Sequence, residues 1–329
     1  MSILVAPDSF KGTFTAPEVA GHLAAGIRSA GGTALELPVA DGGEGTFEVL
    51  VRGLNALPVT ISTVGPWGDA IDAAIGLAPG GTAVVELASA SGLNLPSIHK
   101  RDPVAASSYG TGVLMAEAAR LGAGRILVAA GGSATSDGGA GAIAAIEERG
   151  GLRGAEVVIL SDVTTHFSDA ARVFGPQKGA DPATVELLTR RLEQQGHDFL
   201  RNYGRDPRLL ARTGAAGGFS GGIWARYGAE LVSGADYVLE LLDFDEQLVA
   251  SAAVVVGEGR LDSQTCQGKI IAAILARCGS TPVYAVVGSV GDDLGGYADN
   301  FAGIILASDA PALVTAGASL VRTTRHALG

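Results

Sequence analysis

Cysteine is scarce in this chain, and its scarcity excludes two classes of protein: disulfide-rich domains and domains built around a cysteine-bound metal. Only Cys266 and Cys278 occur among 329 residues, so neither a disulfide framework nor a cysteine-based metal site is expected. Aromatic residues are also few, at 5%. A chain of this length nevertheless buries most of the surface of its unfolded form, and it needs no covalent or metal support to fold.

Basic residues are also fewer than acidic residues. The chain has 23 Lys and Arg against 34 Asp and Glu, a formal net charge of −11. A nucleic-acid partner is therefore not expected, because such partners require a basic surface. An anionic small molecule would have to be held by local backbone N–H groups and a few cations.

Long apolar runs are missing as well. No run approaches the ~20 residues that span a membrane, so no membrane partner is expected. The segment 1–5 contains no basic residue and continues directly into an expected strand, which does not match the basic first part of a secretory signal. We therefore expect a cytoplasmic protein.

Glycine and short apolar runs are what the chain has in quantity. It contains 49 glycines and 47% hydrophobic residues. The apolar runs alternate with helix-like segments, which predicts an α/β protein with a doubly wound parallel sheet. Strands are expected at 3–6, 34–39, 83–88, 125–130, 157–161, 253–257, 283–287 and 303–307. Helices are expected at 16–30, 111–121, 182–202, 268–278 and 311–328.

No linker marks a domain boundary. We expect a discontinuous Rossmann-like α/β domain, formed by residues 1–65 and 236–329, with a second α/β domain of residues 66–235 inserted into it. Ligands would then bind in a cleft between the domains, at the carboxyl ends of parallel strands.

Four loops that follow expected strands combine glycine with acidic, hydroxyl or lysine side chains. They occupy residues 6–12, 40–45, 131–141 and 257–262. Phosphoryl transfer uses such parts, since N–H groups and Lys hold phosphates while carboxylates hold Mg²⁺ or accept a proton. One such loop is often only a solvated turn, but four at strand ends favour a ligand site.

One of these loops also fits a dinucleotide-binding pattern. Gly139 to Ala144 reads G-x-G-x-x-A, and Asp162 stands near the position of the ribose-binding acid. The alternative of an NAD(P)-dependent oxidoreductase follows from it, although these glycines come late after the strand. A Walker A motif is missing, because Gly268-Lys269 is followed by Ile270.

The loops occur as a series of strings in a recognisable order. The strings are APDSFKG (6–12), ADGGEGT (40–46), SYGTG (108–112), GGSATSDGG (131–139), VFGPQKGA (173–180), GAAGG (214–218) and GEGRLD (257–262). Together they resemble the bacterial glycerate kinase family. The resemblance implies a two-domain α/β enzyme that uses ATP and Mg²⁺ to phosphorylate D-glycerate, with 2-phosphoglycerate favoured over 3-phosphoglycerate. A homo-oligomer remains open.

The resemblance and the chemistry of the loops together indicate site residues. The catalytic candidates are Asp8, Lys11 and Asp162, the last as general base. The candidates for binding substrate or phosphate are Ser9, Ser133, Ser136, Asp137, Gly138, Gly139, Lys178 and Arg260. The candidate metal ligands are Asp41, Glu44 and Glu258. Asp41 and Glu44 could instead only cap the helix that follows them, and Arg260 could pair with a neighbouring acid.

Two features depart from the family pattern. The segment 161–167 reads SDVTTHF, where the family has a Cys-Asp-Val string followed shortly by Asn-Pro-Leu. The chain is also shorter than its relatives between Ile146 and Val157. These departures leave open a relative that binds nucleotide or a hydroxy acid without turnover, or that acts on another substrate.

Overall fold

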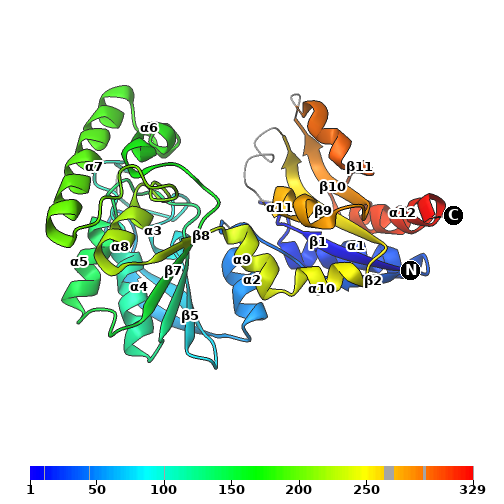
Figure 1. Cartoon of the computed structure of the whole chain (residues 1–329), viewed down its shortest axis with the longest axis horizontal. Helices are drawn as coiled ribbons and strands as arrows, with labels where there is room; N and C mark the ends of the chain where they lie inside the picture. The colour runs from blue at the N-terminus through cyan, green and yellow to red at the C-terminus, as the bar shows by residue number, and fades with distance from the viewer. Residues whose placement is uncertain (11, 44, 100, 263–269, 292–293, 329) are drawn as a thin grey trace. The chain divides into compact units, whose positions relative to one another are not determined.

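The computed structural model describes residues 1–10, 12–43, 45–99, 101–262, 270–291 and 294–328 (Figure 1). The chain forms two compact units, each with its own sheet. The first contains Met1–Asp41 and Ala235–Gly329, and the second contains Gly42–Gly234. The expected α/β class is confirmed, with two mostly parallel sheets flanked by helices.

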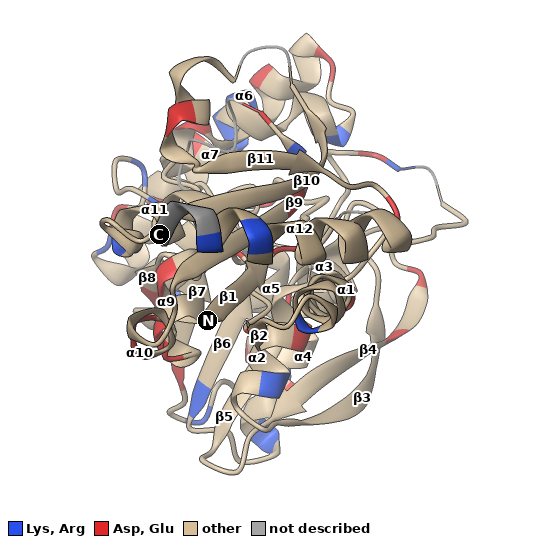
Figure 2. Ribbon diagram, turned by 90° about the vertical axis from the view of Figure 1, so that its right-hand side faces the viewer, with Lys and Arg blue, Asp and Glu red and all other residues tan. Residues whose placement is uncertain are grey.

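The first unit is built on a five-stranded sheet in which all described strand pairs are parallel. Its order is β11-β10-β9-β1-β2. The strands are β1 (Ser2–Pro7), β2 (Thr33–Glu36), β9 (Ala253–Leu261), β10 (Val283–Val290) and β11 (Gly303–Leu306). Charged residues are missing from β10 and β11 (Figure 2). Apolar runs of this kind are typical of parallel strands covered on both faces.

The helices of the first unit connect and cover this sheet. They are α1 (Ala16–Ser29), α9 (Gly234–Leu241), α10 (Phe244–Val249), α11 (Ile270–Cys278), the 3₁₀ helix η4 (Gly295–Asn300) and α12 (Ala310–Leu328). A capping box starts α1, since Thr15 and Glu18 exchange side-chain-to-backbone hydrogen bonds. α1 packs against α12, and both contribute to a core with Val5 and Val255.

The second unit contains a six-stranded mixed sheet with the order β3-β4-β5-β6-β7-β8. β5 to β8 pair in parallel, whereas β3 and β4 form an antiparallel hairpin at the edge. The strands are β3 (Leu57–Val64), β4 (Ala70–Leu77), β5 (Thr82–Glu86), β6 (Arg125–Ala129), β7 (Glu156–Leu160) and β8 (Glu230–Val232). The sequence did not predict β3, β4 or β8.

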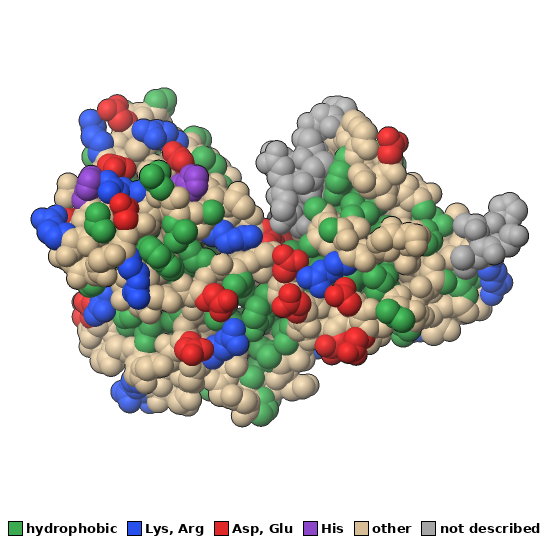
Figure 3. All heavy atoms as spheres, in the orientation of Figure 1, with side chains coloured by type: hydrophobic (Ala, Val, Ile, Leu, Met, Phe, Trp, Pro, Cys, Tyr) green, Lys and Arg blue, Asp and Glu red, His purple; other side chains and the backbone are tan. Residues whose placement is uncertain are grey.

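The helices of the second unit surround this sheet. They are α2 (Thr46–Gly53), α3 (Ala88–Ser91), α4 (Tyr109–Arg120), α5 (Ala140–Glu148), η1 (Phe167–Asp169), α6 (Ala170–Phe174), η2 (Pro176–Lys178), α7 (Pro182–Tyr203) and α8 (Phe219–Tyr227). The expected start of α7 is confirmed, because the Asp181 side chain accepts a hydrogen bond from Thr184 N. On the face of this unit that Figure 3 shows, basic and acidic side chains are interspersed.

The expected boundary near residue 65 is wrong. All eight residues of β3 pair with β4, and β4 continues into the sheet of the second unit through β5. Residues 42–65 therefore belong to the second unit, which begins at Gly42. Within the described ranges, no helix is long and apolar enough to cross a membrane.

Candidate active site

The glycine-rich loop of residues 130–139 lies in the second unit, between β6 and α5. Gly131 N donates to the carbonyl oxygen of Gly42 at 3.0 Å, so the loop begins beside the second predicted loop. A Cβ atom on Gly131 would lie only 2.4 Å from Gly43 Cα. Glycine is required at this close backbone approach.

Long side chains from η2 and α7 brace the loop. Three consecutive loop carbonyls accept their hydrogen bonds: Thr135 O from Lys178 Nζ (2.6 Å), Ser136 O from Arg191 Nη2 (3.0 Å) and Asp137 O from Gln195 Nε2 (2.9 Å). These bonds turn the carbonyl dipoles of the loop toward η2 and α7.

The carboxylate of Asp137 is occupied by the protein itself. Its Oδ2 accepts from Ser108 N and Ser108 Oγ, both at 2.8 Å, and from Gly141 N at 3.1 Å. Its Oδ1 accepts from Gly139 N at 3.1 Å. Asp137 therefore fixes the shape of the loop and ties it to the start of α4.

Several polar groups of the loop remain unused. The Ser136 hydroxyl is buried without a hydrogen-bond partner. In the described part of the chain, the N–H groups of Gly132 and Ser133 also donate to no other group. Gly132 is exposed to solvent. This arrangement suits an anion more than a cation.

Lys178 is the buried cation of this region, with only 8% of its surface exposed. Burial lowers the pKa of Lys178 to about 8, and the neighbouring Asp137 charge opposes part of that effect. Besides Thr135 O, its ammonium group lies 3.4 Å from Ser133 Oγ. A bound anion would add to the partial compensation that Asp137 gives the ammonium charge.

Asp162 follows β7, the strand next to β6, so it lies at the same edge of the sheet as the glycine-rich loop. Its side chain is half-buried, and Oδ1 accepts a hydrogen bond from Ser233 Oγ at 2.7 Å. The backbone of the preceding residue, Ser161, accepts from Arg212 Nη1 at 2.6 Å. A carboxylate fixed at this edge can accept a proton from a bound hydroxyl group.

The first unit holds a separate set of predicted residues around a cavity of about 490 Å³. The cavity lies where β1 and β9 pair, which is where the connections of the sheet leave in opposite directions. Such switch points are the usual ligand sites of doubly wound sheets. Five predicted residues line it together: Asp8, Ser9, Asp41, Glu258 and Arg260.

Ser9 is the most enclosed of these. It is 9% exposed, and its hydroxyl is buried without a hydrogen-bond partner. Its N–H donates to Asp8 Oδ1 at 2.6 Å, which fixes the turn after β1. The exposed Arg260 lies with its Nε 3.5 Å from Asp262 Oδ2, so the ion-pair alternative for Arg260 is present here.

The cavity suits Mg²⁺ that arrives with a nucleotide. Four carboxylates line it, namely those of Asp8, Asp41, Glu258 and Asp262. Among the described residues, no three His, Cys, Asp or Glu form a group that could hold a metal ion alone. Mg²⁺ commonly takes only one or two carboxylates and obtains its other oxygens from phosphates and water. The predicted Lys11 and Glu44 lie outside the described residues.

Four residues of the second unit were missed by the sequence reasoning. They are Ser108, Arg191, Gln195 and Arg212. The first three act on a loop that is distant in sequence, so no local pattern marks them. Ser108 stands in the string SYGTG, but the string by itself indicates no role for the hydroxyl group. Arg212 lies two residues before Gly214, where the string GAAGG begins.

Comparisons with known proteins agree with this geometry. The model of the glycerate kinase family matches residues 3–151 and 147–319. Glycerate 2-kinase of Escherichia coli (strain K12) is 35% identical, over 90% of this chain and 87% of the relative. Glycerate kinase of Bacillus subtilis (strain 168) is 36% identical, over 89% and 86%. The crystal structure of a protein assigned as glycerate kinase 2 from Salmonella typhimurium LT2 has a TM-score of 0.85 at 30% identity, covering 100% of this chain and 99% of that one. The chain belongs to the glycerate kinase family.

Proposed function

We propose that this protein transfers the γ-phosphoryl group of ATP to D-glycerate, with 2-phosphoglycerate favoured over 3-phosphoglycerate as product. The observation that carries the proposal is the family match, which extends from residue 3 to residue 319. The name of the Escherichia coli relative, glycerate 2-kinase, supports the 2-position. ATP use would place the enzyme in the cytoplasm.

Each unit offers one part of the chemistry. In the first unit, Asp8, Asp41 and Glu258 would hold Mg²⁺, which neutralises phosphate charge when it is bound. In the second unit, the loop N–H groups and Lys178 would hold an anionic group of a reactant. Asp162 would accept the proton of the attacking hydroxyl, with its carboxylate oriented by Ser233.

The test is ADP release from ATP and Mg²⁺ with D-glycerate, with L-glycerate and without acceptor, and identification of the product by NMR. We expect turnover that depends on D-glycerate. The position of the phosphate in the product decides between the 2- and 3-hydroxyl groups. A folded protein that binds ATP and D-glycerate but forms no ADP would instead be a non-catalytic relative, as the departure at 161–167 allows.

The role of Asp162 has its own test. Asp162→Asn should lower kcat by about 100-fold or more, because a general base contributes roughly 10²–10⁴. The matched control is Asp169→Asn, a half-buried acid further along the same connection that lies near His166 and Arg172. It should keep near-normal turnover. Equal, near-normal kcat in both variants would remove Asp162 from the mechanism.

A further inference from the structure

Arg212 has a backbone conformation that its side chain does not favour. Its φ angle is 70°, in the left-handed region that non-glycine residues rarely adopt. The surrounding structure holds it there from both sides: Arg212 N donates to Thr164 O at 3.3 Å, and Ser220 Oγ donates to Arg212 O at 2.6 Å. Strained residues of this kind are concentrated at ligand sites.

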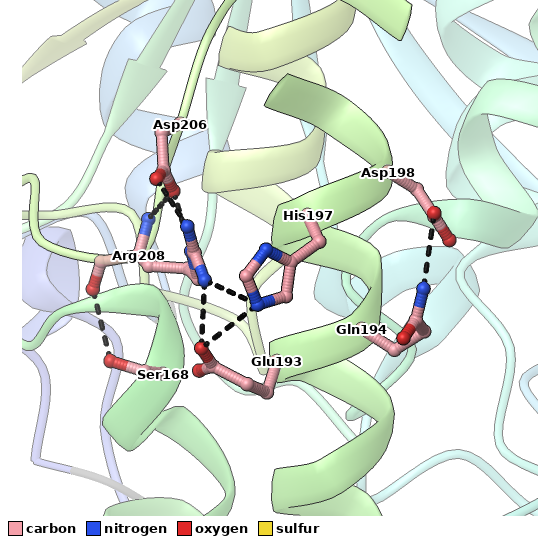
Figure 4. A network of polar contacts seen from close by, with 7 residues as sticks. All are labelled: Ser168, Glu193, Gln194, His197, Asp198, Asp206 and Arg208. Atoms are coloured by element: carbon pink, nitrogen blue, oxygen red, sulfur yellow. Dashed lines mark hydrogen bonds and ion pairs between the residues drawn. The ribbon is translucent and has the colours of Figure 1, made fainter. Parts of the chain in front are cut away.

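The segment that carries Arg212 is also anchored to α7 (Figure 4). Arg208 contacts Asp206 through Nη2 at 2.6 Å and Glu193 of α7 through Nη1 at 2.9 Å. Its hydrogen bond to Asp206 lowers the pKa of that carboxyl group. The Ser168 hydroxyl donates to the Arg208 carbonyl at 3.0 Å. The approach to Arg212 is therefore fixed.

The position of Arg212 places a cation beside the candidate base. Its Nη1 donates to the carbonyl of Ser161, the residue before Asp162, at 2.6 Å. The side chain is half-buried, and in the described part of the chain the guanidinium makes no other hydrogen bond or ion pair. The remaining N–H donors can therefore bind an anion.

Arg212 is moreover tied to the segment that departs from the family pattern. Gly214 N donates to Thr165 O at 2.9 Å, and Phe167 N donates to Thr213 Oγ1 at 3.0 Å. A Cβ atom on Gly214 would lie 2.4 Å from the carbonyl oxygen of His166. The segments 161–167 and 212–214 therefore act as one structural piece.

We propose that Arg212 determines acceptor specificity by binding the carboxylate of the hydroxy acid, whose hydroxyl is then directed to Asp162. This inference rests on the proposed function. A guanidinium binds a carboxylate through two parallel hydrogen bonds, which provides direction as well as affinity. In a chain with a net charge of −11, an anionic substrate needs such a local cation.

Arg212→Gly tests this inference, because glycine accepts a φ of 70° and removes only the side chain. The control is Arg153→Gly, an exposed arginine that also has a positive φ (53°) and is located in the turn before β7. We expect Arg212→Gly to raise KM for D-glycerate by about 10- to 100-fold with KM for ATP unchanged, as one charge-assisted interaction is lost. Arg153→Gly should change neither.

A neutral analogue makes the readout specific. Wild type should prefer D-glycerate to D-glyceramide, whose amide replaces the carboxylate, and Arg212→Gly should lose most of that preference. Arg212→Lys should restore part of it, since it retains the charge but not the paired donors. An unchanged preference would overturn the inference. So would a raised KM for ATP alone, which would assign the guanidinium to a phosphate.

Calorimetric binding of D-glycerate separates this inference from the proposed function. If wild type forms no ADP but binds D-glycerate, and Arg212→Gly binds it at least tenfold more weakly, then the inference holds while the kinase function fails. Equal affinity in wild type and Arg212→Gly would overturn the inference whatever the turnover. Absence of binding to wild type would overturn it as well.

Discussion

Lys178 shows how a single residue links burial to binding in this protein. Its ammonium group is enclosed and donates to Thr135 O, while Asp137 supplies the nearest negative charge. The Asp137 carboxylate is shared with Ser108, Gly139 and Gly141. Desolvation therefore outweighs attraction, and Lys178 holds its proton less tightly than an exposed lysine.

The burial of Lys178 should make the free energy of unfolding depend on pH. The pKa of Lys178 is lowered from 10.5 to about 8, so between these values the unfolded chain carries a proton that the folded chain lacks. The free energy of unfolding should therefore rise with pH in this window, by up to about 1.4 kcal/mol per pH unit from this group. Below pH 8 its contribution should be constant.

Urea unfolding of wild type and Lys178→Met at pH 7, 8, 9 and 10 measures this effect as a difference. The buried thiol of Cys278, whose pKa burial raises to about 11, titrates equally in both proteins and cancels. In wild type, kcat/KM should fall above pH about 8 as the ammonium charge is lost. A stability difference that does not change from pH 8 to 10 would mean that the folded Lys178 keeps an ordinary pKa.

Among the elements, α1 and α12 show how glycine allows two helices to approach closely. A Cβ atom on Gly26 of α1 would lie 1.9 Å from the carbonyl oxygen of Val314. A Cβ atom on Gly317 of α12 would lie 2.2 Å from the carbonyl oxygen of Leu23. Gly21 also lies in α1, but a Cβ atom there meets no atom within 4 Å.

Two alanine substitutions in the same helix should therefore have opposite effects. Gly26→Ala forces α1 away from α12 and should lower the free energy of unfolding by about 1–3 kcal/mol, the usual range for overpacking. Gly21→Ala should raise it by about 0.5–1 kcal/mol, because alanine is the better helix former. Urea unfolding at neutral pH gives both values. Destabilisation of similar size by both variants would show that contact with α12 is not the cause.

The elements also show what the sequence could predict. The parallel strands other than the three-residue β8 were predicted because they are short apolar runs bounded by glycine or proline, as in β1 and β6. The hairpin β3–β4 was missed because much of it is exposed and its polar residues hide the pattern. The glycine-rich loop was predicted, but its brace by Arg191 and Gln195 arises only when α7 packs beside it.

For the whole molecule, the course of the chain explains both the fold and the misplaced boundary. The second unit begins at Gly42 and ends at Gly234. A Cβ atom on Gly42 would lie 3.6 Å from Gly234 Cα, so the chain enters and leaves this unit at one place. Units with adjacent ends are those that tolerate insertion into another fold.

Residues 42–234 should therefore fold without the rest of the chain. They contain a complete sheet, β3 to β8, and a hydrophobic core of their own that includes Phe167 and Phe219. We expect the isolated segment to unfold cooperatively in urea, with dispersed NMR signals. It should show no turnover, because the carboxylate cavity that we propose for Mg²⁺ belongs to the first unit.

The matched control is the segment 66–235, cut at the boundary that the sequence suggested. It lacks α2 and β3, so β4 loses its eight-residue partner and becomes an exposed edge. Such an edge invites association with other chains. This shorter segment should unfold at lower urea concentration or aggregate, whereas 42–234 should stay monomeric and cooperative. Equal behaviour of both segments would mean that the hairpin is an appendage and that the core of the unit begins after it.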